Sequence, residues 1–102
     1  MLCIHMDRSR WEITCEGHSG YAEEGKDIVC AAASMLTATL MRSLMGVTGM
    51  EAETPAPGEA HIKCTPTLGE ANHVAEVFDF ADCGYQMLAN SYPVHVRYTK
   101  RV

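Results

Sequence analysis

Apolar and polar residues alternate in two short stretches at the start of the chain, residues 2–7 and 11–16. Alternation places every second side chain on the same face, which is typical of a half-buried β-strand. The residues between the two stretches, Arg8-Ser9-Arg10, suit a hairpin turn. We therefore predict two antiparallel strands.

The pattern changes after residue 26. Residues 17–26 contain three glycines and two glutamates, a composition that disfavours regular structure, so we predict a mobile loop there. Beyond it, apolar residues recur at steps of three and four, which places them on one face of a helix. Asp27 is the natural N-cap of this helix, and Gly46 and Gly49 end it. The apolar face comprises Val29, Ala33, Leu36, Leu40, Leu44 and Val47.

Arg42 is the only charged residue between positions 28 and 47, so this helix is apolar almost all round. Such a helix needs cover on more than one side, and we expect it to be central or to dimerise. Its serines, threonines, alanines and methionines argue against a membrane span. We interpret the methionines at positions 35, 41, 45 and 50 as core or dimer seam, with an adaptable binding surface as the alternative.

The second half of the chain predicts three more strands and one helix. Residues 50–54 and 60–65 flank Pro55-Ala56-Pro57-Gly58, a strong turn signal, and residues 94–98 alternate again. The helix lies between Pro66 and Pro93. Its predicted buried stripe is Val74, Phe78, Ala81, Tyr85 and Leu88.

The elements therefore follow the order ββαββαβ. We predict an α+β fold in which two helices pack on one face of a mostly antiparallel or mixed sheet. The chain has 102 residues, too few for two independent domains, so residues 1–102 are expected to form one.

The charge balance limits the partners. Eight Lys and Arg against 13 Asp and Glu give a net charge of −5, which argues against nucleic-acid binding through a broad basic face. The first residues lack the basic start and apolar stretch of a secretory signal. We expect a cytoplasmic protein with no membrane partner and no direct nucleic-acid partner.

Five cysteines, an odd number without paired spacing, indicate free thiols in a reducing cytoplasm. We expect four of them to be small buried residues. Cys30 differs, because capping by Asp27 makes it the third helical residue, where the helix dipole and free N–H groups favour a thiolate.

His18, on the glycine-rich loop, is then the candidate base that takes the thiol proton and returns it to a leaving amine. The N–H groups beside Cys30 are candidate donors to the oxyanion. The alternative is that Cys30 only fills space and that His18 lies in solvent.

Two stretches carry a family resemblance: Gly17-His18-Ser19-Gly20-Tyr21-Ala22 and Asp27-Ile28-Val29-Cys30-Ala31-Ala32-Ala33-Ser34. Together they closely resemble the signature of the Prp family, the bacterial ribosomal-processing cysteine proteases. Length, element order and the closing Tyr92-Pro93-Val94-His95-Val96 are also similar, so the resemblance covers essentially the whole chain.

This resemblance implies a homodimeric cysteine endopeptidase that works through an acyl-enzyme without cofactor or metal. Its implied substrate is the precursor of large-subunit ribosomal protein L twenty-seven, which loses an N-terminal extension by a cut between Phe and a small residue. The alternative function is a non-catalytic module that binds ribosomes or assembly intermediates through the same loop.

The resemblance places the catalytic roles on His18 and Cys30 and supporting roles on Gly17, Asp27 and Ser34. From the residues alone, Asp27 either caps the helix or orients the His18 ring. Ser34 shares the helical face of Cys30 and either contacts substrate or bonds the carbonyl one turn back.

The loop residues also leave alternatives open. Gly17 and Gly20 are the expected hinges of a loop that closes over an extended peptide. Tyr21 packs either on an aromatic substrate side chain or on the protein body. Glu23 and Glu24 either face a basic substrate or form a solvated loop tip.

No metal site is expected. Cys3 and His5 share a strand face but lack two further ligands at recognisable intervals. His61 and Cys64 are three apart, which points them to opposite faces of a strand.

Overall fold

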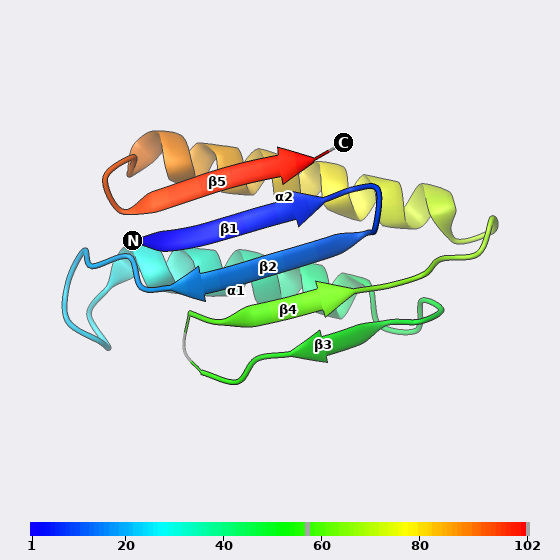
Figure 1. Ribbon diagram of the computed structural model, residues 1–102, viewed down its shortest axis with the longest axis horizontal. Coiled ribbons are helices and arrows are strands. Elements are labelled where there is room, and N and C mark those ends of the chain that lie inside the picture. Colours follow the sequence, from blue (N-terminus) through cyan, green and yellow to red (C-terminus); the bar gives the residue numbers. More distant parts are fainter. Residues whose placement is uncertain (57, 102) are drawn as a thin grey trace.

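The computed structural model describes residues 1–56 and 58–101. Its elements are β1 (Leu2–Asp7), β2 (Glu12–Gly17), α1 (Ile28–Ser43), β3 (Glu51–Glu53), β4 (Ala60–Lys63), α2 (Ala71–Ser91) and β5 (Val96–Arg101). Both helices cover one face of a five-stranded sheet (Figure 1). The predicted order ββαββαβ and the predicted two-layer α+β arrangement are confirmed.

The sheet order is β3-β4-β2-β1-β5. β1 pairs antiparallel with β2, which confirms the predicted hairpin, and parallel with β5, so the sheet is mixed. Leu2 lies opposite Gly17 on one side and opposite Val96 on the other. The end of β2 and the start of β5 therefore lie at the same end of the sheet, on either side of β1, where residues 18–27 leave β2 (Figure 1).

The core lies between the sheet and the helices. α2 buries all five positions of its predicted stripe, and α1 buries one face through Val29, Ala33, Thr37 and Leu40. The sheet contributes Leu2, Ile4, Met6, Ile13, Ile62 and Val96. Removing this apolar surface from water is the main favourable contribution to folding.

Several predicted boundaries are wrong. β3 and β4 are shorter than the predicted 50–54 and 60–65. α1 ends at Ser43, with Leu44 as its C-cap, although the periodicity continues to residue 47; Leu44 and Val47 are buried from the turn that follows. β5 begins at Val96 and extends to Arg101 instead of spanning 94–98. The N–H groups of residues 95 and 96 both donate to the Tyr92 carbonyl at 3.0 and 2.9 Å, so a turn occupies the predicted start.

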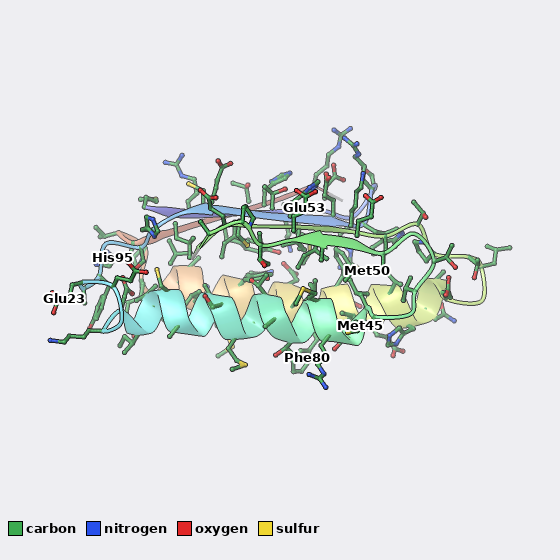
Figure 2. All side chains as sticks on the ribbon, turned by 90° about the horizontal axis from the view of Figure 1, so that it is seen from below. Glu23, Met45, Met50, Glu53, Phe80 and His95 are labelled. Atoms are coloured by element: carbon green, nitrogen blue, oxygen red, sulfur yellow. The ribbon has the colours of Figure 1, made fainter. Side chains whose placement is uncertain are left out.

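The methionines divide between core and surface, and the prediction for the cysteines is wrong. Met41 and Met50 pack against the core, whereas Met35 and Met45 are 68% and 71% exposed. Phe80 lies on the outer side of the helices (Figure 2). Within one chain α1 packs under the sheet and beside α2 and leaves its outer side exposed, so it is not central. Only two cysteines are buried, Cys15 and Cys64, instead of the expected four.

Neither described helix combines the length and apolar character that crossing a bilayer requires. The predicted turn at 55–58 includes Pro57, which lies outside the described residues.

Candidate active site

Cys30 is the third residue of α1, as the sequence predicts. Asp27 is the N-cap, and its Oδ1 accepts hydrogen bonds from the N–H groups of Val29 and Cys30 at 3.0 and 2.9 Å. A carboxylate at this position satisfies two of the backbone donors that a helix leaves unpaired at its start. The nucleophile candidate is therefore fixed in the first turn of α1 by the cap residue.

The other oxygen of Asp27 holds the loop. Its Oδ2 accepts from the hydroxyl of Ser19 and from the N–H of Ala22 at 3.4 Å. The Ser19 hydroxyl, followed by the N–H of Cys30, lowers the pKa of Asp27 from its ordinary value of 3.8 to about 2. Asp27 is thus a carboxylate at neutral pH and joins the loop to the helix.

Ser19 makes most of the contacts that hold this loop, although the sequence pattern assigns no role to its side chain. It is 2% exposed. Its N–H donates to the Sγ of Cys30 at 3.4 Å, and its hydroxyl accepts from the N–H of Tyr21 at 3.2 Å. Its carbonyl accepts from Nδ1 of His95 at 2.9 Å. Every polar group of Ser19 is therefore engaged in holding the loop beside the thiol.

Tyr21 packs on the protein body. Its ring meets the rings of Tyr92 and His95 edge-on, with centroids 5.6 and 5.4 Å apart. Tyr21 is nonetheless 45% exposed. Of the two alternatives, the structure supports anchoring of the loop.

His18 is exposed and faces the same cleft as Cys30. This histidine cleft has a volume of about 410 Å³, and its lining includes His18, Glu24, Asp27, Cys30, Ser34 and Gly58. Within residues 1–56 and 58–101, no hydrogen bond joins the His18 ring to Cys30 or to Asp27. The structure thus supports the capping role of Asp27 and brings His18 and Cys30 to one cavity without a direct bond.

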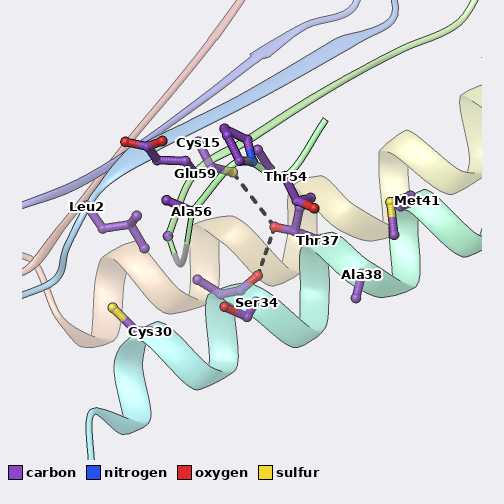
Figure 3. Close-up of a pocket in the computed structure, with 14 residues that line it drawn as sticks. Leu2, Cys15, Cys30, Ser34, Thr37, Ala38, Met41, Thr54, Ala56 and Glu59 are labelled. Carbon is purple, nitrogen blue, oxygen red and sulfur yellow. Dashed lines mark hydrogen bonds between the residues drawn. The ribbon is translucent and has the colours of Figure 1, made fainter. Parts of the chain in front are cut away.

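A second cleft opens on the other side of Cys30. This apolar cleft, about 380 Å³, is lined mainly by small or apolar side chains. Cys30, Ser34, Ala38 and Met41 follow one another along α1 at its mouth, opposite Leu2 and Ala56 (Figure 3). Cys30, Ser34 and Gly58 line both clefts, so the thiol lies where the two cavities meet.

Gly58 and Gly17 are required for the close contact between Gly58 and the start of the loop of residues 18–27. Gly58 has φ +83°, and a β-carbon there would lie 2.4 Å from the Gly17 carbonyl oxygen and 3.4 Å from Nδ1 of His18. Gly17 itself has φ +90°, and a β-carbon there would lie 2.4 Å from the carbonyl oxygen of Met1. Neither contact leaves room for a side chain.

A family model described as cysteine protease Prp matches residues 2–97. The chain belongs to this family, and it is a cysteine protease. The fold agrees with solved structures of Prp. The ribosomal processing protease Prp of Staphylococcus aureus, bound covalently to a product peptide, aligns with a TM-score of 0.80 and 18% identity over 99% of this chain and 100% of that one.

The same Staphylococcus aureus protease with a substrate peptide gives a TM-score of 0.68 and 18% identity, covering 98% of this chain and 97% of that chain. The protein SMU.848 of Streptococcus mutans gives 0.71 and 24%, covering 98% and 91%. No curated protein matches the chain.

The N–H groups beside Cys30, which the sequence offers as donors to an oxyanion, already have partners in this structure. The N–H groups of Val29 and Cys30 are occupied by the Asp27 side chain, and the N–H of Ala31 donates to the Asp27 carbonyl at 3.1 Å. The N–H that faces the sulfur belongs to Ser19. The sequence offered no signal for this, since it depends on how the loop folds back.

Ser34 is exposed and lines both clefts, which fits the alternative that it contacts substrate.

Among the described residues, no three His, Cys, Asp or Glu side chains converge as a metal site requires. His5 bonds Thr99 at 2.7 Å, and His61 bonds Glu12.

Proposed function

We propose that this Prp protease cleaves a peptide bond through a dyad of Cys30 and His18. The observation that carries the proposal is the position of Cys30 at the start of α1, in a cleft shared with His18, with the Ser19 N–H directed at its sulfur. A hydrogen bond from a backbone amide stabilises a thiolate, which is the attacking form of cysteine.

The proposed reaction has two steps. His18 takes the thiol proton, and Sγ of Cys30 bonds the substrate carbonyl carbon; the bond to nitrogen then breaks, and the amine leaves with the proton from His18. Water, deprotonated by His18, attacks the resulting thioester and releases the acid and the thiol. Because no bond joins the ring to the thiol in this structure, a rearrangement of the loop carrying Gly17 and Gly20 is part of the proposal.

The two clefts give the substrate a direction. A base that protonates the leaving amine must lie on the amine's side, so the residues after the scissile bond belong in the histidine cleft. The residues before it belong in the apolar cleft. A cavity of about 380 Å³ with small apolar walls suits a bulky side chain such as Phe, and Glu24 favours basic residues after the cut.

We propose the precursor of ribosomal protein L twenty-seven as the substrate, cut between Phe and a small residue. The family match and the described activity of the Staphylococcus aureus protease, a ribosomal processing protease crystallised with peptides, support this choice. The apolar cleft supports Phe before the cut.

We also propose a homodimer located in the cytoplasm. The outer face of the two helices exposes large apolar side chains, including Met35, Phe80 and Met87, and a second copy is the proposed cover. The five free cysteines are consistent with a reducing compartment. Sedimentation analysis tests the dimer directly, and a monomer at micromolar concentration contradicts it.

The test of function is cleavage of a peptide that spans the Phe-to-small junction of that precursor. Cys30→Ala and His18→Ala are each expected to lower kcat/KM at least about a thousandfold, because each removes one member of the dyad. Cys83→Ala, at an exposed cysteine on α2, is the matched control and should retain full activity. Undiminished cleavage by either dyad variant overturns the assignment, and peptide that binds without being cut favours a binding module.

A further inference from the structure

His95 lies immediately before β5, far along the chain from the loop of residues 18–27, yet it contacts two residues of that loop. Its Nδ1 bonds the carbonyl of Ser19 at 2.9 Å, and its ring meets that of Tyr21 at 5.4 Å. Since a carbonyl can only accept, Nδ1 must carry the proton, and the imidazole tautomer is fixed by this bond. His95 and the loop lie at the same end of the molecule (Figure 2).

The bond from His95 completes the fixation of Ser19. The Ser19 side chain is tied to Asp27, and its carbonyl is tied to His95. With its side chain and its carbonyl both bonded, Ser19 presents its N–H to the Sγ of Cys30. The two bonds restrict movement of the residue as a whole and thereby hold its amide beside the sulfur.

The amides of Val29, Cys30 and Ala31 already have partners, whereas the Ser19 amide faces the sulfur. Val29 and Cys30 both donate to the Asp27 side chain, and Ala31 donates to the Asp27 carbonyl. When the sulfur bonds the carbonyl carbon of the substrate, the oxygen that gains charge is attached to that carbon and lies two bonds from the sulfur. An N–H already 3.4 Å from Sγ is in a position to meet that oxygen after a small shift.

We infer that His95 is a positioning residue for the protease reaction: acting through Ser19, it holds the backbone N–H of that residue toward Cys30 and the developing oxyanion. This inference rests on the proposed dyad. It assigns no contact between His95 and the substrate. The group that touches the reacting atoms is the Ser19 amide.

The decisive variants are His95→Ala, which removes the donor, and His95→Asn, whose side-chain amide also donates a hydrogen bond. Misplacing one oxyanion donor should lower kcat of the Ala variant about tenfold to a hundredfold, with KM changed less than about twofold. The Asn variant should recover most of the loss. Thermal unfolding of each variant, measured in parallel, separates this effect from loss of fold.

Ser19→Ala provides the second variant. It keeps the backbone N–H but removes the hydroxyl bond to Asp27. It should also lower kcat, and combining it with His95→Ala should cost less than the product of the single effects, because both changes release the same amide. An independent effect, with the two losses multiplying in full, contradicts the inference, as does an unchanged kcat in His95→Ala.

A readout that needs no cleavage keeps this inference distinct from the proposed function. Hydrogen exchange in residues 18–26 should be faster in His95→Ala than in the unmodified protein, and slower again in His95→Asn. If the peptide is not cut at all, the proposed function fails, while the exchange experiment still tests whether His95 holds the loop in place. Equal exchange in all three proteins overturns the positioning role.

Discussion

Asp27 accepts a hydrogen bond from the backbone N–H of Cys30 at 2.9 Å, so the N-cap residue of α1 also fixes the proposed nucleophile. The same carboxylate binds Ser19 and Ala22 from the loop. One side chain thereby sets the position of the thiol relative to the loop that carries His18.

This arrangement predicts that the unmodified protein and the Asp27→Asn variant differ in free energy of unfolding, and that the difference depends on pH. Asparagine is also a good N-cap, so the variant keeps the helix start but loses the charge. Hydrogen bonds from Ser19 and Cys30 lower the pKa of Asp27 from 3.8 to about 2, so they stabilise the folded state where the carboxylate is ionised. The greater stability of the unmodified protein is fully present above pH 3.8 and is lost as the pH falls through about 2.

The measurement is the free energy of unfolding of both proteins by urea from neutral pH downward. The difference between them should stay constant at neutral and mildly acidic pH and shrink toward zero between about 4 and 2, where protonated Asp27 comes to resemble Asn. A difference that persists unchanged at pH 2 would falsify this account of the cap.

The thiols should differ in reactivity. Cys15 and Cys64 are buried, and burial raises the pKa of both thiols, so iodoacetamide should label them slowly. The informative comparison is between Cys30, which accepts from the Ser19 N–H, and Cys83, which is exposed on α2. We expect Cys30 to react about tenfold faster at neutral pH, measured by mass spectrometry of peptides from the folded protein. Faster labelling of Cys83 would mean that the free enzyme does not activate Cys30.

The sequence predicted those parts of the fold that depend only on residues close together in the chain. The stripe of α2 is an example, since Val74, Phe78 and Tyr85 all face the core because the helix repeats every 3.6 residues. The boundary of β5 was missed because the N–H groups at its predicted start bond the Tyr92 carbonyl. Nothing in the alternation of residues 94–98 indicates that turn.

The candidate active site likewise has features set by neighbouring residues and features set by residues far apart in the chain. The N-cap at Asp27 and the place of Cys30 in the first turn follow from neighbouring residues, and both are confirmed. The bond between Ser19 and His95 joins residues 76 apart in the chain. It exists because β5 pairs in parallel with β1, and that pairing brings the start of β5 to the same end of the sheet as the end of β2, with β1 between them. A single sequence carries no record of such a pairing.

Gly58→Ala should damage the site more than Gly20→Ala. Both glycines have positive φ, +83° and +70°, so each alanine bears the cost of a left-handed conformation, about 1–2 kcal/mol. Only at Gly58 does the added β-carbon collide, at 2.4 Å from the Gly17 carbonyl oxygen; at Gly20 it meets open space. The collision should add about 1–3 kcal/mol of destabilisation.

Urea unfolding measures the two costs, and peptide cleavage shows whether the displaced loop carries His18 with it. We expect the activity of Gly58→Ala to fall further than that of Gly20→Ala after both are compared at a temperature where each is folded. Equal losses of stability and activity in the two variants would show that the contact between the β3–β4 connection and the loop has no influence on the site.

The direction of the substrate across Cys30 can be tested with two alanines of one helix. Ala38 lines the apolar cleft, Ala31 lines the histidine cleft, and both are exposed on α1. Leucine suits a helix about as well as alanine, so neither substitution should unfold the protein. If the residues before the scissile bond occupy the apolar cleft, Ala38→Leu should lower kcat/KM about tenfold for a peptide with Phe before the cut, and much less for one with Ala there.

Ala31→Leu is the matched control, because it should leave that preference unchanged and instead weaken peptides with a bulky residue after the cut. Four peptides, large or small on either side of the bond, measured with both variants and the unmodified protein, give the full comparison. The reverse pattern, with Ala31→Leu altering the preference before the cut, would place the leaving amine away from His18. That outcome is incompatible with proton delivery from His18 to the amine, and it would require another donor.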